Sequence, residues 1–293
     1  MKLGIDVGGT QTKIAVITDS CEMLSVNSCP TVTEQGSFLE FICGIVEEYR
    51  ENFPDIQDVG IGIPGKVDAR RGTIVFSPAL QILESLDFCK EVHRRCGLPV
   101  FVENDVNAWA LAEKTVGVCR MVDIYVLIAI GTGIGAGIVI DGRIYRGFNF
   151  EAGEIGYMVS EEDYDNVCPT KSDFGSFEKK ASAIAISCQY NQRTGESVTT
   201  KEVFERARKG HDKLADELIH KQFKTLAVGI SNVICVLQPQ KVVIGGGLAG
   251  EGDYLIRHLN QYVKMLIPTE IPVVLSGTGQ WGGAIGAALA AKW

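Results

Sequence analysis

The residues with the clearest chemical potential lie near the start of the chain, in the segment Asp6–Lys13. An acidic residue ends an expected strand and a glycine turn follows, with Thr10 and Lys13 expected at the hairpin tip. Glycines let backbone N–H groups approach phosphate oxygens, a threonine hydroxyl adds a donor, and aspartate can hold Mg²⁺ through water. An ordinary hairpin would explain the glycines but not the aspartate and threonine. We therefore expect a phosphate site formed by Asp6, Gly8, Gly9, Thr10 and Lys13.

Two further glycine turns offer donors of the same kind. Gly131, Thr132 and Gly133 open a second glycine-rich hairpin, and Gly246 and Gly247 follow an apolar stretch that reads as a strand. Three such turns serving one nucleotide are more specific than any one of them.

Three segments partly match other nucleotide motifs. Gly60–Val67 approaches the P-loop pattern, but Val67 has no hydroxyl for magnesium and Asp68–Gly72 reads as a turn where a helix is needed. The segment Gly131–Ala136 partly matches the dinucleotide fingerprint, but it leads into an expected strand where that motif needs a helix. Gly245–Gly250 matches the dinucleotide fingerprint and keeps a nucleotide-linked oxidoreductase open as an alternative, although little chain remains for a complete dinucleotide domain.

Glu103, Asn104 and Asp105 lie where an expected strand becomes a helix. A carboxylate there can accept a proton from a hydroxyl, and the helix N-terminus favours an anion. A plain helix cap is the alternative for Asp105. Beside the phosphate turns, we favour a catalytic base.

The elements that position these residues alternate along the chain, which predicts an α/β protein. Strands are expected at 3–7, 12–18, 59–63, 100–103, 124–130, 137–140, 241–244 and 272–275. Helices are expected at 37–50, 85–96, 104–114, 176–191, 200–209, 211–237, 253–266 and 282–291, with 147–168 irregular. Both halves open with a strand, a Gly-Thr turn and a strand, which indicates an internal duplication. We expect an N-terminal lobe (1–117), a C-terminal lobe (118–280) and a C-terminal helix (281–293) that packs back on the first lobe.

Composition limits the possible partners. The 293 residues carry 28 Lys and Arg against 36 Asp and Glu, a net charge of −8. This acidity argues against nucleic acid or an anionic membrane as the main partner. The uncharged stretch Ile124–Ile140 is shorter than a membrane span and contains glycines typical of a turn. Nine scattered cysteines and no signal-peptide pattern favour reduced thiols and a cytoplasmic location.

These motifs together resemble the ROK family (repressors, open reading frames, kinases) of the actin-like ATPase superfamily. The resemblance runs in order through nearly the whole chain, and its segments are Asp6–Lys13, 60–68, 103–108, 131–137, 152–157 and 243–247. It implies a two-lobed, ribonuclease H-like fold with a central cleft. It also implies a kinase that uses ATP and Mg²⁺ to phosphorylate the 6-hydroxyl of a hexose.

The resemblance implies a role for individual residues. Asp105 corresponds to the base that takes the proton of the 6-hydroxyl, and Asn104, Glu154 and the backbone of Gly65 correspond to sugar ligands. The glycine turns correspond to the ATP site, with Gly246 and Gly247 facing the nucleoside.

This chain departs from the family pattern in one region. Tyr157 stands where most members carry His, and Cys168 is the only cysteine of the stretch that usually binds zinc. The set of four N or S ligands that tetrahedral zinc needs is therefore not present, and we expect no zinc. Glu178 matches the final glutamate of that stretch and is a candidate sugar ligand. Tyr157 is expected to alter recognition of the sugar, because a phenol donates differently from an imidazole.

The sequence leaves the sugar open among glucose, a β-glucoside and N-acetylmannosamine. The family resemblance implies a homodimer. A sugar-sensing regulator of the same family is a further alternative, but such regulators place a helix-turn-helix before the first hairpin, which here starts at Leu3. We therefore expect no nucleic-acid partner.

Overall fold

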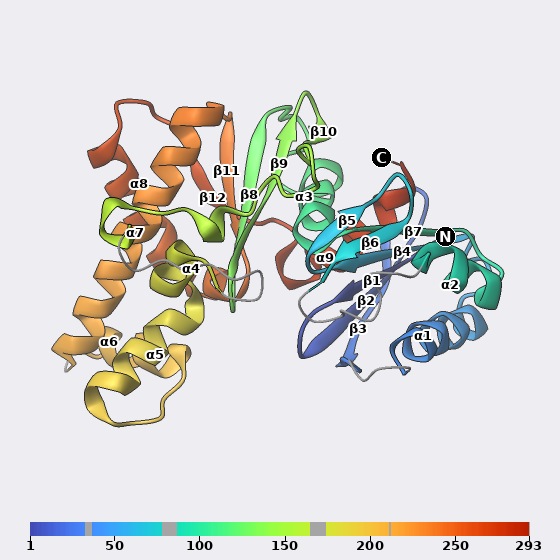
Figure 1. The fold of residues 1–293 in the computed structure, drawn as a ribbon, viewed down its shortest axis with the longest axis horizontal. Helices are drawn as coiled ribbons and strands as arrows, with labels where there is room; N and C mark the ends of the chain where they lie inside the picture. The colour runs from blue at the N-terminus through green and yellow to red at the C-terminus, as the bar shows by residue number, and fades with distance from the viewer. Residues whose placement is uncertain (33–36, 78–86, 165–173, 211, 293) are drawn as a thin grey trace. The chain divides into compact units, whose positions relative to one another are not determined.

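The computed structural model describes residues 1–32, 37–77, 87–164, 174–210 and 212–292. The chain forms two compact units, whose elements are labelled in Figure 1. Unit 1 comprises residues 1–123, 137–152 and 276–293, and unit 2 comprises residues 124–136 and 153–275. The chain therefore passes between the units four times, and each unit is described by itself.

Unit 1 is built on a five-stranded sheet with the order β3-β2-β1-β4-β7. Its strands are β1 (Lys2–Val7), β2 (Gln11–Ile17), β3 (Met23–Pro30), β4 (Asp58–Ile63) and β7 (Val100–Asn104). β1, β4 and β7 are parallel, and Asp6, Gly62 and Glu103 share one row across them. The carboxyl ends of these strands therefore meet at one edge, the edge at which open α/β sheets bind ligands.

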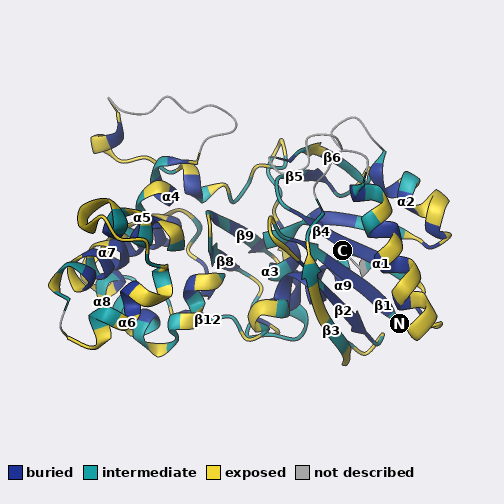
Figure 2. Ribbon diagram, turned by 90° about the horizontal axis from the view of Figure 1, so that it is seen from below, coloured by how far each residue is buried: buried dark blue, intermediate teal, exposed yellow. Residues whose placement is uncertain are grey.

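Helices cover both faces of this sheet (Figure 1). α1 (Phe38–Asn52) and α2 (Phe88–Cys96) pack on one face through Phe38, Ile42 and Phe88. α3 (Asp105–Thr115) and α9 (Gly282–Leu289) pack on the other through small residues, which include Ala112, Ala284 and Ala288. Figure 2 shows β1 and β4, between these layers, in the dark blue of buried residues.

α9 approaches the sheet closely because β1 and β4 present glycines to it. A Cβ added to Gly4 would lie 1.9 Å from the carbonyl oxygen of Ala284, and one added to Gly60 would lie 1.7 Å from that of Ala287. A side chain at either strand position would push the helix away.

A small hairpin of β5 (Lys66–Asp68) and β6 (Thr73–Phe76) completes the first part of unit 1. The N–H of Gly72 donates to the carbonyl oxygen of Asp68 at 2.9 Å, which closes the turn between the strands. Asp68–Gly72 is therefore a turn, as the sequence predicts, and the P-loop interpretation is excluded because β5, and not a helix, follows Gly65.

The second sheet has the order β10-β9-β8-β11-β12 and repeats the pattern of the first. Its strands are β8 (Tyr125–Ile130), β9 (Ile134–Ile140), β10 (Arg143–Ile144), β11 (Lys241–Gly245) and β12 (Val273–Leu275). In both sheets a hairpin strand pairs with the first strand, and two parallel strands follow on its other side. The expected internal duplication is therefore confirmed at the level of topology.

Five α-helices lie in the described residues of unit 2. They are α4 (Ser176–Ala181), α5 (Ala183–Thr194), α6 (Thr200–Arg208), α7 (Lys213–Leu237) and α8 (Asp253–Leu266). The prediction of one helix over 176–191 is wrong, because Ser182 is extended and separates α4 from α5. The side-chain amide of Gln222 on α7 donates to the carbonyl oxygens of Ala181 and Ser182 at 3.0 and 2.7 Å, which satisfies the backbone at the break.

The predicted α/β class is confirmed, and each predicted strand corresponds to an observed one. The sequence analysis missed β3, β5, β6 and β10, which are short or polar. Residues 85 and 86 of one predicted helix, residue 211 of another and residues 165–168 of the predicted irregular segment lie outside the described residues. None of the helices that the structure describes is long and apolar enough to span a membrane.

Candidate functional site

Two aspartates lie close together at the carboxyl edge of the sheet in unit 1. Asp6 is near the end of β1, and Asp105 is the first residue of α3, directly after β7. Gly62 of β4 lies beside both, since a Cβ added to it would be 3.6 Å from Oδ1 of Asp6 and 3.5 Å from Cα of Asp105. Lys13 is paired with Asp6 across β1 and β2. The fold thus brings two carboxylates and one ammonium group to the strand ends.

The two carboxylates affect each other's protonation. The pKa of Asp6 is raised to about 7, chiefly by burial and also by the negative charge of Asp105, while the charge of Lys13 lowers it. Burial also raises the pKa of Asp105, against hydrogen bonds from the backbone of Val106 and the side chain of Asn104. Raised pKa values on paired carboxylates are typical of functional sites, because a structure selected for stability alone gains nothing from them.

Asn104 fixes the position of Asp105. Its side-chain oxygen accepts from the N–H groups of Val106 and Asn107 at 3.0 Å, which caps the N-terminus of α3. Its amide nitrogen donates to Oδ1 of Asp105 and to the carbonyl oxygen of Gly65, both at 3.0 Å. Asn104, and not Asp105, therefore caps α3, and it links the side chain of Asp105 to the Gly65 turn.

Gly65 is required at that turn. Its φ is +112°, and an added Cβ would lie 2.3 Å from the carbonyl oxygen of Phe76. Both the left-handed conformation and the close approach exclude a side chain.

A buried ion pair, which the sequence analysis missed, supports the same strand end. Glu103 is 2% exposed, and Arg146 donates to its Oε2 from Nε at 3.0 Å and from Nη2. The N–H of Asn104 and the amide of Asn107 donate to Oε1 at 3.0 and 3.3 Å. An acidic residue at the end of an apolar strand was a signal for Glu103. No spacing in the sequence pointed to Arg146.

The first glycine turn lies between β1 and β2, with Gly9 and Thr10 exposed at its tip. Thr31, directly after β3, stabilises this turn. The Thr31 hydroxyl donates to the carbonyl oxygen of Gly8 at 2.8 Å, and the Thr31 N–H donates to the carbonyl oxygen of Thr10 at 3.0 Å. The prediction that Lys13 lies at the tip is wrong, because Lys13 is within β2 and pairs with Asp6. The tip is shorter than expected since the antiparallel register continues to Thr12.

Unit 2 brings its own two glycine turns together. β8 and β11 are parallel neighbours that end at Ile130 and Gly245, so Gly131 and Gly246 follow at the same edge. Gly246 packs on β8, with φ of +83° and an added Cβ 2.4 Å from the carbonyl oxygen of Ile130. A 3-10 helix, Gly247–Glu251, follows directly, so the dinucleotide fingerprint lacks the α-helix that it needs at this point.

Three of the glycines have no packing reason to be glycine. Added Cβ atoms on Gly9, Gly131 and Gly247 would meet no atom within 4 Å, and none of these residues has a positive φ. The backbones of Gly9 and Gly247 are therefore open to a group from outside the chain, which suits a nucleotide, whereas the N–H of Gly131 already donates to the carbonyl oxygen of Gly133 at 2.9 Å.

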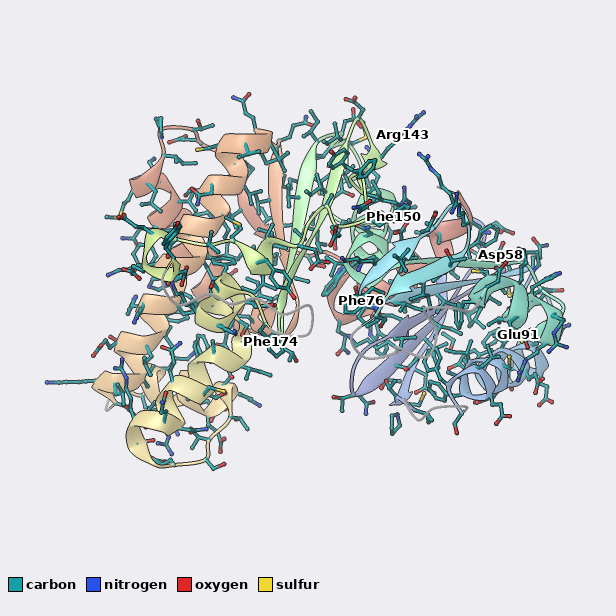
Figure 3. The ribbon with its side chains drawn as sticks, viewed as in Figure 1. Asp58, Phe76, Glu91, Arg143, Phe150 and Phe174 are labelled. Carbon is teal, nitrogen blue, oxygen red and sulfur yellow. The ribbon has the colours of Figure 1, made fainter. Side chains whose placement is uncertain are left out.

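The remaining predicted sugar ligands lie in unit 2. Glu154 directly precedes a short 3-10 helix that ends at Tyr157, and both side chains are exposed. Glu178 is buried on α4, where Oε1 accepts from the N–H of Gly175 at 2.7 Å and Oε2 from that of Ile134 at 2.9 Å. Glu178 thus braces the turn that contains Gly133, next to Phe174, which Figure 3 labels just before α4.

The donor set fits magnesium in one respect. Mg²⁺ retains water and binds one or two carboxylates together with substrate phosphates, and Asp6 at the open strand end offers such a carboxylate. A cation there would also relieve the repulsion between Asp6 and Asp105. In the described residues no three His, Cys, Asp or Glu side chains form a metal cluster. Cys168 lies outside those residues, and the absence of zinc stays a prediction.

A cavity of about 460 Å³ lies in unit 1 beside Arg146. Arg70, Arg71 and the aromatic residues Tyr145, Phe148 and Phe150 line it, and Phe150 is labelled in Figure 3. Phe148 is 96% exposed.

The repeated sheet topology, the paired aspartates at the strand ends and the glycine turns define the actin-like ATPase fold. The model of the ROK family matches residues 2–293, and the chain belongs to the ROK family. A β-glucoside kinase of Listeria innocua is 29% identical over 255 residues, which are 85% of this chain and 83% of that protein. A glucokinase of Thermotoga maritima is 30% identical over 311 residues, covering 98% of this chain and 95% of the relative.

A solved structure agrees with these relatives. A ROK family glucokinase from Streptomyces griseus, in complex with glucose and AMPPNP, superposes with a TM-score of 0.86 at 27% identity. The match covers 100% of this chain and 99% of that one. The family identified by the sequence resemblance is therefore confirmed, and these relatives are sugar kinases.

Proposed function

We propose that this protein transfers the terminal phosphoryl group of ATP to the 6-hydroxyl of a hexose or hexose derivative. The observation that carries the proposal is the placement of Asp105, held by Asn104 and coupled to Asp6 at the open end of the sheet in unit 1. Sugar kinases of the same family support the reaction class.

Asp105 would accept the hydroxyl proton as the sugar oxygen bonds to the terminal phosphorus and the bond to ADP breaks. Its pKa, raised by burial, makes it a better base than an exposed aspartate. Asn104 holds the carboxylate, and the Glu103–Arg146 pair holds the backbone of Asn104.

Asp6 would hold Mg²⁺ through water, and that ion would neutralise charge on the phosphoryl group when bound. The N–H groups at Gly9 and Thr10 would donate to phosphate oxygens, and Gly247 would face the nucleoside of ATP. The donors at Gly9 and Thr10 need no reorganisation, because their turn is fixed by the chain's own hydrogen bonds.

The cavity beside Arg146 bears on the choice of sugar. Its aromatic rings, beside the Arg146 that supports Asn104 through Glu103, would suit a substituent carried by the hexose. We therefore place a β-glucoside beside glucose as a substrate, and N-acetylmannosamine remains an alternative.

An assay coupled to ADP release, with ATP, Mg²⁺ and these three sugars, tests the proposal. We expect sugar-dependent release of ADP, with the phosphate on the 6-hydroxyl by NMR. Asp105→Asn should lower turnover by about 10²- to 10⁴-fold, the usual contribution of a general base, and change sugar affinity little.

Asp253→Asn is the matched control, because Asp253 also opens an α-helix but is exposed in unit 2. It should leave turnover unchanged. Failure to turn over any sugar of the panel would contradict the function, and an active Asp105→Asn variant would contradict the assignment of the base.

A further inference from the structure

A buried carboxylate outside the proposed chemistry has an unusually complete set of donors. Glu113 on α3 is fully buried, and no ion pair found in the described residues involves it. Its Oε1 accepts from the hydroxyls of Ser276 and Thr278, both at 2.6 Å, and from the N–H of Thr278 at 3.0 Å. Its Oε2 accepts from the N–H groups of Val118 and Gly277 at 2.9 and 3.2 Å.

Trp109 sets the direction of the hydroxyl bonds. Its Nε1 donates to Oγ of Ser276 at 3.1 Å and to Oγ1 of Thr278 at 3.0 Å. Both hydroxyls therefore accept from the indole and give their own protons to Glu113. Since burying a carboxylate without a cation is costly, this arrangement is not explained by stability alone.

The anchored segment leads directly into α9. Residues 276–278 are followed by a 3-10 turn and then by Gly282, the first residue of the helix. An added Cβ on Gly282 would lie 2.0 Å from Nε1 of Trp109, and one on Gly283 would lie 2.3 Å from Oδ2 of Asp6. The first turn of α9 is therefore seated between Trp109 and the carboxylate of Asp6.

Helix α3 consequently carries both Asp105, beside Asp6, and Glu113, which binds residues 276–278. α3 begins with Asp105 and contains Glu113 two turns later, and it contacts α9 again where Gly286 meets the carbonyl oxygen of Ala108. We propose that Glu113 is a positioning residue, which anchors residues 276–278 so that the first turn of α9 holds Asp6 in place relative to Asp105. The effect on ligands rests on the proposed function, in which Asp6 serves the nucleotide and not the sugar.

Glu113→Gln is a sharp test because it keeps the size of the side chain. Donors converge on both carboxylate oxygens, so the new NH₂ group faces a donor whichever way the amide is turned. We expect faster amide hydrogen exchange in residues 276–286. We also expect affinity for Mg·AMPPNP, measured by calorimetry, to fall at least about tenfold, since a set of charge-assisted hydrogen bonds is lost. Affinity for the sugar chosen from the panel should stay within about twofold.

Two milder variants keep the test decisive if Glu113→Gln does not fold. Thr278→Val removes one short hydrogen bond to Glu113 and should show the same selective loss to a smaller degree. Gly283→Ala leaves the anchor intact and places a methyl group against Asp6, so it should weaken nucleotide binding without faster exchange at 276–278. Glu51→Gln and Gly44→Ala, both exposed on α1, are the controls and should change neither quantity.

The inference would be overturned if Glu113→Gln changed neither the amide hydrogen exchange nor the affinity for Mg·AMPPNP. It would also be overturned if the variant lost affinity for the nucleotide and for the sugar to the same degree. Failure of the proposed function is distinguishable. In that case the wild-type protein shows no sugar-dependent ADP release, while the exchange experiment still reports whether Glu113 anchors α9.

Discussion

The buried pair of Glu103 and Arg146 gives the most quantitative prediction for unit 1. Arg146→Met keeps much of the apolar volume of the side chain but removes the guanidinium. Oε1 of Glu103 would keep its two amide donors, whereas Oε2 would lose both of its partners. Because Glu103 is only 2% exposed, water cannot replace them freely, and we expect the free energy of unfolding to fall by about 3–5 kcal/mol.

Urea unfolding followed by tryptophan fluorescence measures this loss in the right part of the molecule. Trp109 and Trp281 belong to unit 1, and no tryptophan of the sequence falls within unit 2. Adding Glu103→Gln to Arg146→Met should recover part of the lost stability, because the uncompensated charge disappears. The wild type, Arg146→Met, Glu103→Gln and the double variant form a double-mutant cycle.

Arg94→Met is the matched control in the same unit. Arg94 pairs with Glu91 on the exposed face of α2, where Glu91 is labelled in Figure 3, and such surface pairs contribute little. A loss below about 1 kcal/mol in Arg146→Met, or strict additivity in the cycle, would refute the reasoning from burial.

Two further predictions concern protonation and the glycine turns. Burial raises the pKa of Asp105, which must be ionised to act as the proposed base. We therefore expect kcat/KM for the sugar to fall as the pH decreases through a pKa above the usual range of an aspartate. Initial rates at saturating Mg·ATP measure this dependence, and a flat profile down to pH 4 would contradict it. Gly246→Ala should lower the melting temperature measured by circular dichroism, because φ of +83° and the contact with Ile130 exclude a methyl group. Gly247→Ala should leave the melting temperature unchanged and weaken ATP binding, because an added Cβ there meets no atom within 4 Å. Equal melting temperatures for the two variants would show that the close approach at Gly246 is not needed.

Local patterns in the sequence carried much of the fold. Apolar runs bounded by glycine fixed the long strands and helices within a few residues, and the repeated Gly-Thr turn revealed the duplication that the two sheets share. The elements that escaped, such as β3 and β10, are short or polar and are stable only because a neighbouring strand pairs with them. Such pairing leaves no periodic pattern in the chain.

The chemical groups of the candidate site could be predicted from the chain, because Asp6, Asn104, Asp105 and the glycine turns form contiguous motifs. The residues that hold these groups in place could not be predicted in this way. Arg146 reaches Glu103 across 43 positions of the chain, and Glu113 binds residues 163 to 165 positions away. Partners so distant meet only after the sheet and its covering helices have packed, so no local pattern encodes them.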